Sequence, residues 1–252
     1  MTAKYINLCI SAIVALTGIC SASAQTSKYE LNVGDFTSLN LVDGINVEYK
    51  CHEDSAGYAV FNTSPQIADQ LIFDASKKGV LKIEKAFHDE NELVLGLPVI
   101  HVYSRFLTKV ENAGDSTLVV EQLKSCPQFC ARVIGNGRIV VKNIDCQEFE
   151  GRISTGNGSI VATGKCDKAK LVNVGSGSIQ ADRLEAKDAS CRFFGGGTIG
   201  IWPTGTLSVK GMFPGKLYYR GEPQKIKNYG MGPKIIPLKG AYTSDKKEPR
   251  PE

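Results

Sequence analysis

Histidine is scarce in this chain, which has three among its 252 residues. His52, His88 and His101 form no HxxxH or HExxH pattern, so we expect each to be an ordinary surface or strand residue. Cys126 and Cys130 form a single CxxxC pair with no second pair or histidine close by, which is too few ligands for a zinc site. The sequence therefore predicts no metal, no cofactor and no catalytic residue.

A strong charge of one sign is also missing. The chain has 30 Lys and Arg against 26 Asp and Glu, a net charge of +4, whereas nucleic-acid-binding domains carry clustered basic faces. We expect no nucleic acid as a partner. The apolar and charged fractions, 42% and 22%, exclude a disordered chain, a coiled coil and a collagen-like fibre.

Long hydrophobic runs are absent too, since none reaches the roughly 20 residues of a membrane-spanning helix. A shorter apolar stretch, Ile10 to Ile19, follows Lys4 and precedes the small residues ASA at 22–24. These are the three parts of a secretory signal, which predicts a signal peptide over residues 1–24 and cleavage before Gln25. We expect export to the periplasm or the outer surface of a Gram-negative bacterium.

Glycine, by contrast, is abundant, with 26 in the chain, and it recurs at a fixed period after residue 105. Short glycine units are spaced 19 to 21 residues apart, and four of them have the form G-x-G. Their leading glycines are Gly135, Gly156, Gly175 and Gly195, with related units at Gly114 (AGDSTL) and Gly215 (PGKL). In chain order, an apolar column follows the first five of these glycines by four residues: Leu118, Ile139, Ile160, Ile179 and Ile199.

A period near 20 residues indicates stacked units and is too short for repeats of paired helices. The segments between the glycines are β-rich, so we predict a parallel β-helix in which each coil pairs with the next about 4.8 Å away. The apolar column then forms a stack inside. The glycines mark a corner that needs positive φ or a close backbone approach, where Asn136 and Asn157 form a ladder.

Other uses of glycine repeats do not fit. A calcium-binding β-roll needs an aspartate after the glycines, where this chain has Arg138, Ser159, Ser178 and Thr198. A leucine-rich repeat needs an LxxLxL pattern, which is absent. No helix and no Lys-Ser/Thr pair follows the GxG units, which excludes a phosphate-binding loop.

The first half of the chain, residues 25–105, lacks the GxG units but also has a β pattern. Apolar and polar residues alternate at 45–49 and 80–83, as is typical of half-buried strands, and Pro65 to Asp69 can form one helical turn. A bare solenoid end exposes unpaired strand edges. We therefore expect this half to cap the solenoid or to continue it irregularly.

The predicted fold is all-β: a single-stranded, right-handed parallel β-helix with about 20 residues per coil, capped at both ends. Five prolines between residues 203 and 237 indicate an irregular C-terminal cap, because proline cannot join a β ladder. One domain spans 25–240, with the GxG repeats and the C-terminal cap in 106–240. We expect residues 241–252 to be a flexible tail.

Three cysteines follow the same period as the glycines. Cys126, Cys146 and Cys166 lie 20 residues apart and should occupy one column on successive coils. Stacked Cα atoms about 4.8 Å apart fall in the range for a disulfide, which export would permit. One bridge with a thiol left over, and a buried ladder of free thiols, fit the sequence equally well.

Acidic groups are the candidates for a carbohydrate-active site, which needs two carboxylates facing one groove. The groups are Glu53 with Asp54, Asp89 with Glu90 and Glu92, and Asp145 with Glu148 and Glu150. No acid repeats near the 20-residue period, so we expect these side chains to lie in solvated loops.

Aromatic residues near the C-terminus are the most site-like feature of the sequence. The residues are Trp202, Phe213, Tyr218, Tyr219 and Tyr229. Aromatic faces in a groove suit a sugar or a protein partner. We favour the alternative, in which these side chains pack to cover the end of the solenoid.

Three motifs carry a resemblance to a known family: DGINV at 43–47, the repeated G-[NSG]-G-x-I units, and LYYRGEP at 217–223. Over roughly Phe36 to Ile226 they resemble the secreted, mostly Bacteroidetes family of putative auto-transporter adhesins with a head GIN domain. The resemblance implies an exported β-solenoid without a known biochemical activity. The family's repeat is usually Ser-Gly-Ser-Gly, and its first serine is replaced here by Ile134, Thr155, Val174 or Phe194.

The sequence thus favours a non-catalytic binding or adhesion module of the cell envelope, which presents its solenoid surface to a glycan or a protein. The first alternative is a carbohydrate-active β-helix enzyme, a lyase or a hydrolase. The second is a periplasmic scaffold. Adhesion leads because no catalytic constellation is visible and the family resemblance points the same way.

Overall fold

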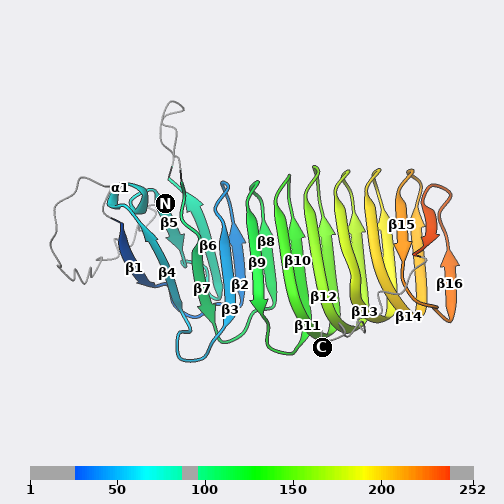
Figure 1. The fold of residues 1–252 in the computed structure, drawn as a ribbon, viewed down its shortest axis with the longest axis horizontal. Coiled ribbons are helices and arrows are strands. Elements are labelled where there is room, and N and C mark those ends of the chain that lie inside the picture. Colours follow the sequence, from blue (N-terminus) through cyan, green and yellow to red (C-terminus); the bar gives the residue numbers. More distant parts are fainter. Residues whose placement is uncertain (1–25, 87–95, 239–252) are drawn as a thin grey trace, which may run out of the picture.

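The computed structural model describes residues 26–86 and 96–238, which form one elongated stack of β coils (Figure 1). All strands belong to one hydrogen-bonded sheet wound around a single core, and the only helix of these residues is α1 (Pro65–Ala68), where a helical turn was expected. The strands are β1 (Ser27–Asn32), β2 (Ser38–Leu41), β3 (Val47–Cys51), β4 (Tyr58–Thr63), β5 (Leu71–Asp74), β6 (Val80–Lys85), β7 (Ile100–Ser104), β8 (Lys109–Asn112), β9 (Thr117–Gln122), β10 (Cys126–Val133), β11 (Arg138–Ile153), β12 (Ser159–Asn173), β13 (Ser178–Phe193), β14 (Thr198–Gly211), β15 (Lys216–Tyr219), β16 (Lys225–Asn228) and β17 (Lys234–Pro237).

The repeat half forms regular parallel coils, as the glycine period predicts. Strands β11 to β14 are 14 to 16 residues long, and each pairs in parallel with the next. Each of these strands runs along two sides of its coil and bends between them, where the register shifts; in β11 the shift falls between Val141 and Ile144. The prediction of an all-β parallel solenoid with coils of about 20 residues is confirmed.

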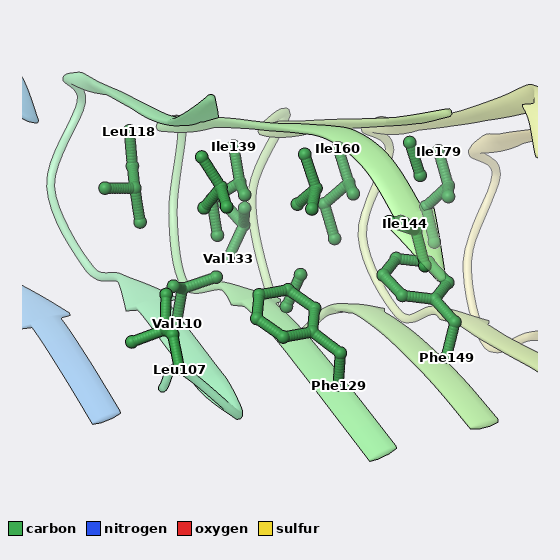
Figure 2. Close-up of a cluster of buried hydrophobic side chains, with 14 of the residues drawn as sticks. Leu107, Val110, Leu118, Phe129, Val133, Ile139, Ile144, Phe149, Ile160 and Ile179 are labelled. Atoms are coloured by element: carbon green, nitrogen blue, oxygen red, sulfur yellow. The ribbon is translucent and has the colours of Figure 1, made fainter. Parts of the chain in front are cut away.

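The predicted apolar column lies in the centre of the core (Figure 2). The column contains Leu118, Ile139, Ile160, Ile179 and Ile199, at matching register positions on successive coils. All of these side chains are fully buried. Phe129 and Phe149 face the column and stack with their ring centroids 6.5 Å apart. Burial of each such side chain stabilises the fold by about 1.5–3 kcal/mol, so the column is a main source of stability.

The glycine turns form one corner of the solenoid, seen as the row of turns along the upper edge of Figure 1. Gly156 has a φ of 74°, in the left-handed region that glycine tolerates. A Cβ atom on Gly177 would instead clash with the carbonyl oxygen of Gly158 on the coil below. The backbone N–H of Asn157 donates to Oδ1 of Asn136 over 3.1 Å, so the two asparagines are neighbours on successive coils, joined through the backbone of one of them.

The N-terminal half continues the solenoid, but its coils do not follow the order of the chain. Strands β2 and β3 lie between β6 and β7 on one side and β8 and β9 on the other. The chain therefore returns across the coil of β2 and β3, where the backbone N–H of Thr108 donates to the carbonyl of Thr37 over 2.8 Å. Strands β1, β4 and β5 pair antiparallel and end the stack. This half thus both caps and continues the solenoid.

The C-terminal end is more regular than its prolines suggest. Strands β15, β16 and β17 continue the parallel coils in register, with Pro203 inside β14 and Pro237 at the end of β17. Within the described residues β16 pairs only with β14, and β17 only with β15. Pro237 lies on such an edge strand, where one side of the ladder is missing anyway, and Pro203 falls between the parts of β14 that pair with β15 and β16. The expected irregular cap is therefore a further coil with open edges.

Candidate binding groove

A groove of about 520 Å³ runs along the bends of the long strands. It crosses successive coils from the start of β10 to β14, parallel to the stacking direction of the solenoid. Its lining consists of Ser125, Cys126, Pro127, Asp145, Cys146, Gln147, Lys165, Cys166, Asp167, Glu185, Lys187 and Thr204. The first four coils contribute two or three equivalent positions each and the last contributes Thr204 alone, so the groove follows the period of the repeat.

The cysteine column forms the middle of this lining. Cys126, Cys146 and Cys166 are register neighbours on β10, β11 and β12, as their 20-residue spacing predicts, and are only 5 to 8% exposed. All cysteines of the described residues are free thiols. Of the two arrangements that the sequence left open, the structure therefore contains the thiol ladder. The column ends at Ala186, the register neighbour of Cys166 on β13.

Burial determines the protonation of these thiols. Desolvation raises the pKa of Cys146 to about 12, with smaller contributions from the neighbouring thiols and Asp145. Desolvation likewise raises the pKa of Cys166 to about 12, helped by Asp167. Since the thiolate is the nucleophile and the metal ligand, protonated thiols form an unreactive strip.

Charged and polar residues flank the thiols on both sides. One side carries Asp145, Lys165 and Glu185, which are register neighbours on successive coils. The other side carries Gln147, Asp167 and Lys187, one position after the cysteine column. On the first side the sign of the charge alternates from coil to coil, at the spacing of about 4.8 Å between paired strands.

This arrangement suits a polar chain that lies along the solenoid. A purely anionic or cationic polymer would meet a repelling charge in the groove, whereas hydroxyls, amides and paired charges find a partner on each coil. In the first column Lys165 separates Asp145 from Glu185. Among residues 26–86 and 96–238, no three His, Cys, Asp or Glu side chains are placed to hold a metal ion.

The acids named from the sequence do not converge on one site. Glu53 is exposed and pairs with Lys124 at 3.2 Å, and Glu148 pairs with Lys170 at 2.7 Å. Asp145 alone of these acids lines the groove. The group at residues 89–92 lies outside the described residues.

The histidines have local partners. His101 lies on β7 with Nδ1 3.3 Å from Oε2 of Glu48, and His52 packs edge-on against Tyr103 with ring centroids 6.4 Å apart. Both therefore behave as the surface and strand residues that were expected. His88 lies outside the described residues.

The five C-terminal aromatics separate into two sets. Trp202, Tyr218 and Tyr219 are half-buried, and the guanidinium of Arg220 lies 4.7 Å from the centre of the Trp202 ring. Of the three, Tyr219 packs against the core, as we favoured, whereas Trp202 and Tyr218 follow the buried residues Ile201 and Leu217 along their strands. Phe213 and Tyr229 are instead exposed at the glycine corner, so the five do not form a single aromatic groove.

The family described as "Putative auto-transporter adhesin, head GIN domain" matches residues 35–223, most of the described chain. The chain belongs to this family. A search of curated proteins finds no match. Family membership confirms the resemblance carried by the GxG units and the DGINV motif.

Solved structures with the GIN-domain fold match almost along their whole length. A putative adhesin from Bacteroides fragilis has a TM-score of 0.72 and 18% identity, and the match covers 86% of this chain and 98% of that one. A putative adhesin from Parabacteroides merdae has a TM-score of 0.68 and 16% identity, with 85% and 97% covered. One from Parabacteroides distasonis has a TM-score of 0.67 and 17% identity, with 85% and 98% covered. At these identities the likeness shows the shared fold.

The sequence of this GIN domain indicated the floor of the groove, through the cysteine period, and one residue of its sides, Asp145. Lys165, Asp167 and Lys187 were not singled out from the sequence. Their position next to the periodic cysteine column was the one sequence signal that could have indicated them. The sequence did not show the bend of the strands, which places the residues before and after each cysteine around one groove.

Proposed function

We propose that this GIN-domain protein is a non-catalytic binding module of the cell envelope whose groove holds an extended polar chain, a glycan strand or a peptide. The observation that supports the proposal is the groove itself, about 520 Å³ in volume and lined by charges of both signs around the thiols. A ladder of paired coils holds these groups in place. Binding therefore needs little ordering of the protein, which favours affinity.

Several features favour binding over catalysis. The groove thiols hold their protons tightly, and Lys165 lies between two of the groove acids. A glycosidase or lyase needs an acid and a base placed on either side of one bond. Three of the similar solved structures are described as putative adhesins, and a fourth, from Parabacteroides distasonis, as a putative lipid binding protein. An envelope scaffold is the second alternative, and it would be indicated by a partner protein bound in the groove.

The proposal includes export. The family is one of auto-transporter adhesins, and residues 1–24 have the composition of a signal peptide. No helix in the described residues is both long and apolar enough to cross a membrane. The mature chain would begin at Gln25. Proteolysis of intact cells distinguishes the outer surface, where the protein is lost, from the periplasm, where it survives until the outer membrane is opened.

Glycan and peptide arrays probed with the purified protein test the binding function. We expect a hit of either class to lose about tenfold or more of its affinity in Lys165→Glu, because a groove charge is reversed. Lys78→Glu makes the same charge change in an exposed turn of the N-terminal half and should bind as the parent does. Equal affinity in both variants would place the ligand elsewhere. A retained glycan recovered in cleaved form would overturn the non-catalytic assignment.

A further inference from the structure

A set of exposed apolar side chains lies at the C-terminal end of the glycine corner, on turns far from the groove. We call it the C-terminal ridge, and it consists of Phe194, Met212, Phe213, Tyr229 and Met231. Met212 is 82% exposed and Met231 is 99% exposed, and each of the three aromatic rings is at least half exposed. Large apolar side chains gathered in this way on a surface mark an interaction site.

The ridge is continuous across three coils. Phe193 and Gly211 are register partners, so the next residues, Phe194 and Met212, are neighbours on adjacent coils. Val209 pairs with Asn228, and the same register brings Met212 beside Met231. In Figure 1 the turns that follow β13, β14 and β16 are the last ones of the upper row, at the yellow-to-red end.

Basic side chains border the ridge on both sides. Arg192 and Lys210 are register partners just before it, and Lys216 and Lys234 are register partners just after it. All four are exposed, and none takes part in an ion pair formed by the described residues. The ammonium of Lys210 lies 5.1 Å from the centre of the Tyr229 ring, at the border between the charges and the ridge.

The earlier turns of the same corner show that the fold does not require this surface. The turn position of Phe194 is taken by Ile134 and Val174 on earlier coils, and both of these side chains are half-buried. The tips of those earlier turns carry the polar residues Asn136, Asn157 and Ser176. Charge changes along the corner as well: residues 126–204 contain ten basic and seven acidic side chains, whereas residues 205–238 contain six basic and one acidic. Within residues 126–238, exposed large apolar side chains and an excess of positive charge therefore appear together on the last coils.

We propose that the C-terminal ridge docks on the surface of an anionic lipid bilayer, a function beyond the proposed groove. An element with an apolar edge between basic flanks inserts its apolar side chains at the boundary of headgroups and acyl chains, while lysines contact anionic headgroups. Methionine and aromatic side chains suit this depth, because they are apolar and adaptable or amphipathic. Docking here leaves the groove, at the strand bends, open to its ligand.

Two other occupants fit the ridge less well. A second copy placed face to face by a two-fold axis would bring the basic flanks of the ridge against basic flanks of the other copy, and like charges oppose such contact. A soluble polyanion would pair with the lysines but gain nothing from Met212 and Met231, whose exposure is the larger anomaly. Only a surface that is anionic outside and apolar beneath uses both features.

Co-sedimentation of the purified full-length protein with vesicles tests the proposal. We expect binding to vesicles of phosphatidylethanolamine with phosphatidylglycerol, little binding to phosphatidylcholine alone, and weaker binding as salt rises. Lys216→Glu should weaken binding by about tenfold or more, because each basic residue at an anionic surface contributes severalfold. Met212→Ser combined with Met231→Ser should weaken binding by a similar factor through lost insertion.

Matched controls occupy the same corner. Arg138→Glu makes the same charge change at the register position of Lys216 four coils earlier, and Asn157→Ser alters a polar tip; both should bind as the parent does. Thermal unfolding checks that every variant is folded.

Each contrary result overturns the docking. Failure of the parent protein to sediment with anionic vesicles would contradict the docking proposal directly. Vesicle binding that is lost in Lys216→Glu but kept in the double methionine variant would indicate a soluble polyanion instead. Capture of the methionine variant on immobilised heparin to the same extent as the parent would support that assignment. Concentration-dependent dimers that the ridge variants abolish would assign it to a second copy.

Discussion

The thiols of Cys146 and Cys166 show how the burial of a side chain determines its reactivity. Cysteine is ordinarily the most reactive side chain of an exported protein, and three in a row invite a disulfide. Here each sulfur lies in the floor of the groove, and desolvation raises the pKa of both thiols to about 12. The residues act as small apolar groups that shape a groove.

We predict that these two thiols react slowly with iodoacetamide in the folded protein. With a pKa of about 12 instead of the ordinary value near 9, the thiolate population at pH 8 is lower by about 1,000-fold. Mass spectrometry of peptides labelled with and without denaturant measures the protection. Equal labelling of Cys146 in both states would show that the thiol is open to solvent and ionises normally.

The same pKa shift has a consequence for stability. The folded state holds these protons more tightly than the unfolded state does, so the free energy of unfolding is unaffected below pH 9 and falls as pH rises from about 9 towards 12. Cys146→Ala combined with Cys166→Ala should flatten this decline, whatever the double variant costs in core packing.

At the scale of the strand, alternation decides which residues reach the core. On β12, Ile160 is fully buried in the apolar column, whereas its neighbour Val161 is only half-buried and points to the opposite face. A one-residue slip would exchange these roles. The glycine turns and the Asn136–Asn157 hydrogen bond oppose such a slip at the corner.

We predict that Ile160→Asp lowers the free energy of unfolding by more than about 4 kcal/mol, because it places an unpaired charge in the core. Val161→Asp should cost about 1 kcal/mol or less, since its side chain reaches water. Urea unfolding followed by circular dichroism measures both. Similar midpoints for the two variants would show that the column does not face inwards.

At the scale of the molecule, stability depends on how many neighbours a coil has rather than on its place in the chain. The coil of β2 and β3 lies near the N-terminus yet is paired on both sides. Strands β16 and β17 pair on one side only among the described residues. Coils in a solenoid open from an unpaired end.

We predict that amide hydrogen exchange of β2 and β3 is as slow as that of β8 and β9, and that β16 and β17 exchange fastest among the strands of the repeat half. Mass spectrometry of exchanged peptides gives the order. Fast exchange of β2 and β3 would mean that the N-terminal coil is not inserted between its neighbours.

The sequence by itself determined the repeat, and with it the class of fold, the apolar column and the cysteine ladder. Each of these follows from spacing along the chain, because residues one period apart must stack in a parallel solenoid. The family resemblance rests on the same units. The strands of the N-terminal half were also visible in alternation at 45–49 and 80–83.

Only the tertiary structure decided the order of the N-terminal coils, the groove and the C-terminal ridge. The insertion of β2 and β3 depends on pairing between strands far apart in the chain, which no local pattern encodes. The groove exists because each long strand bends beside its cysteine, bringing Lys165 and Asp167 to the two sides of one hollow. Phe213 and Tyr229 looked like cap packing until the register placed them on an exposed corner. The physical reason is the same in each case. The period of the repeat determines which residues stack on successive coils, whereas the bends of the strands and their pairing partners determine which of those residues are exposed to solvent.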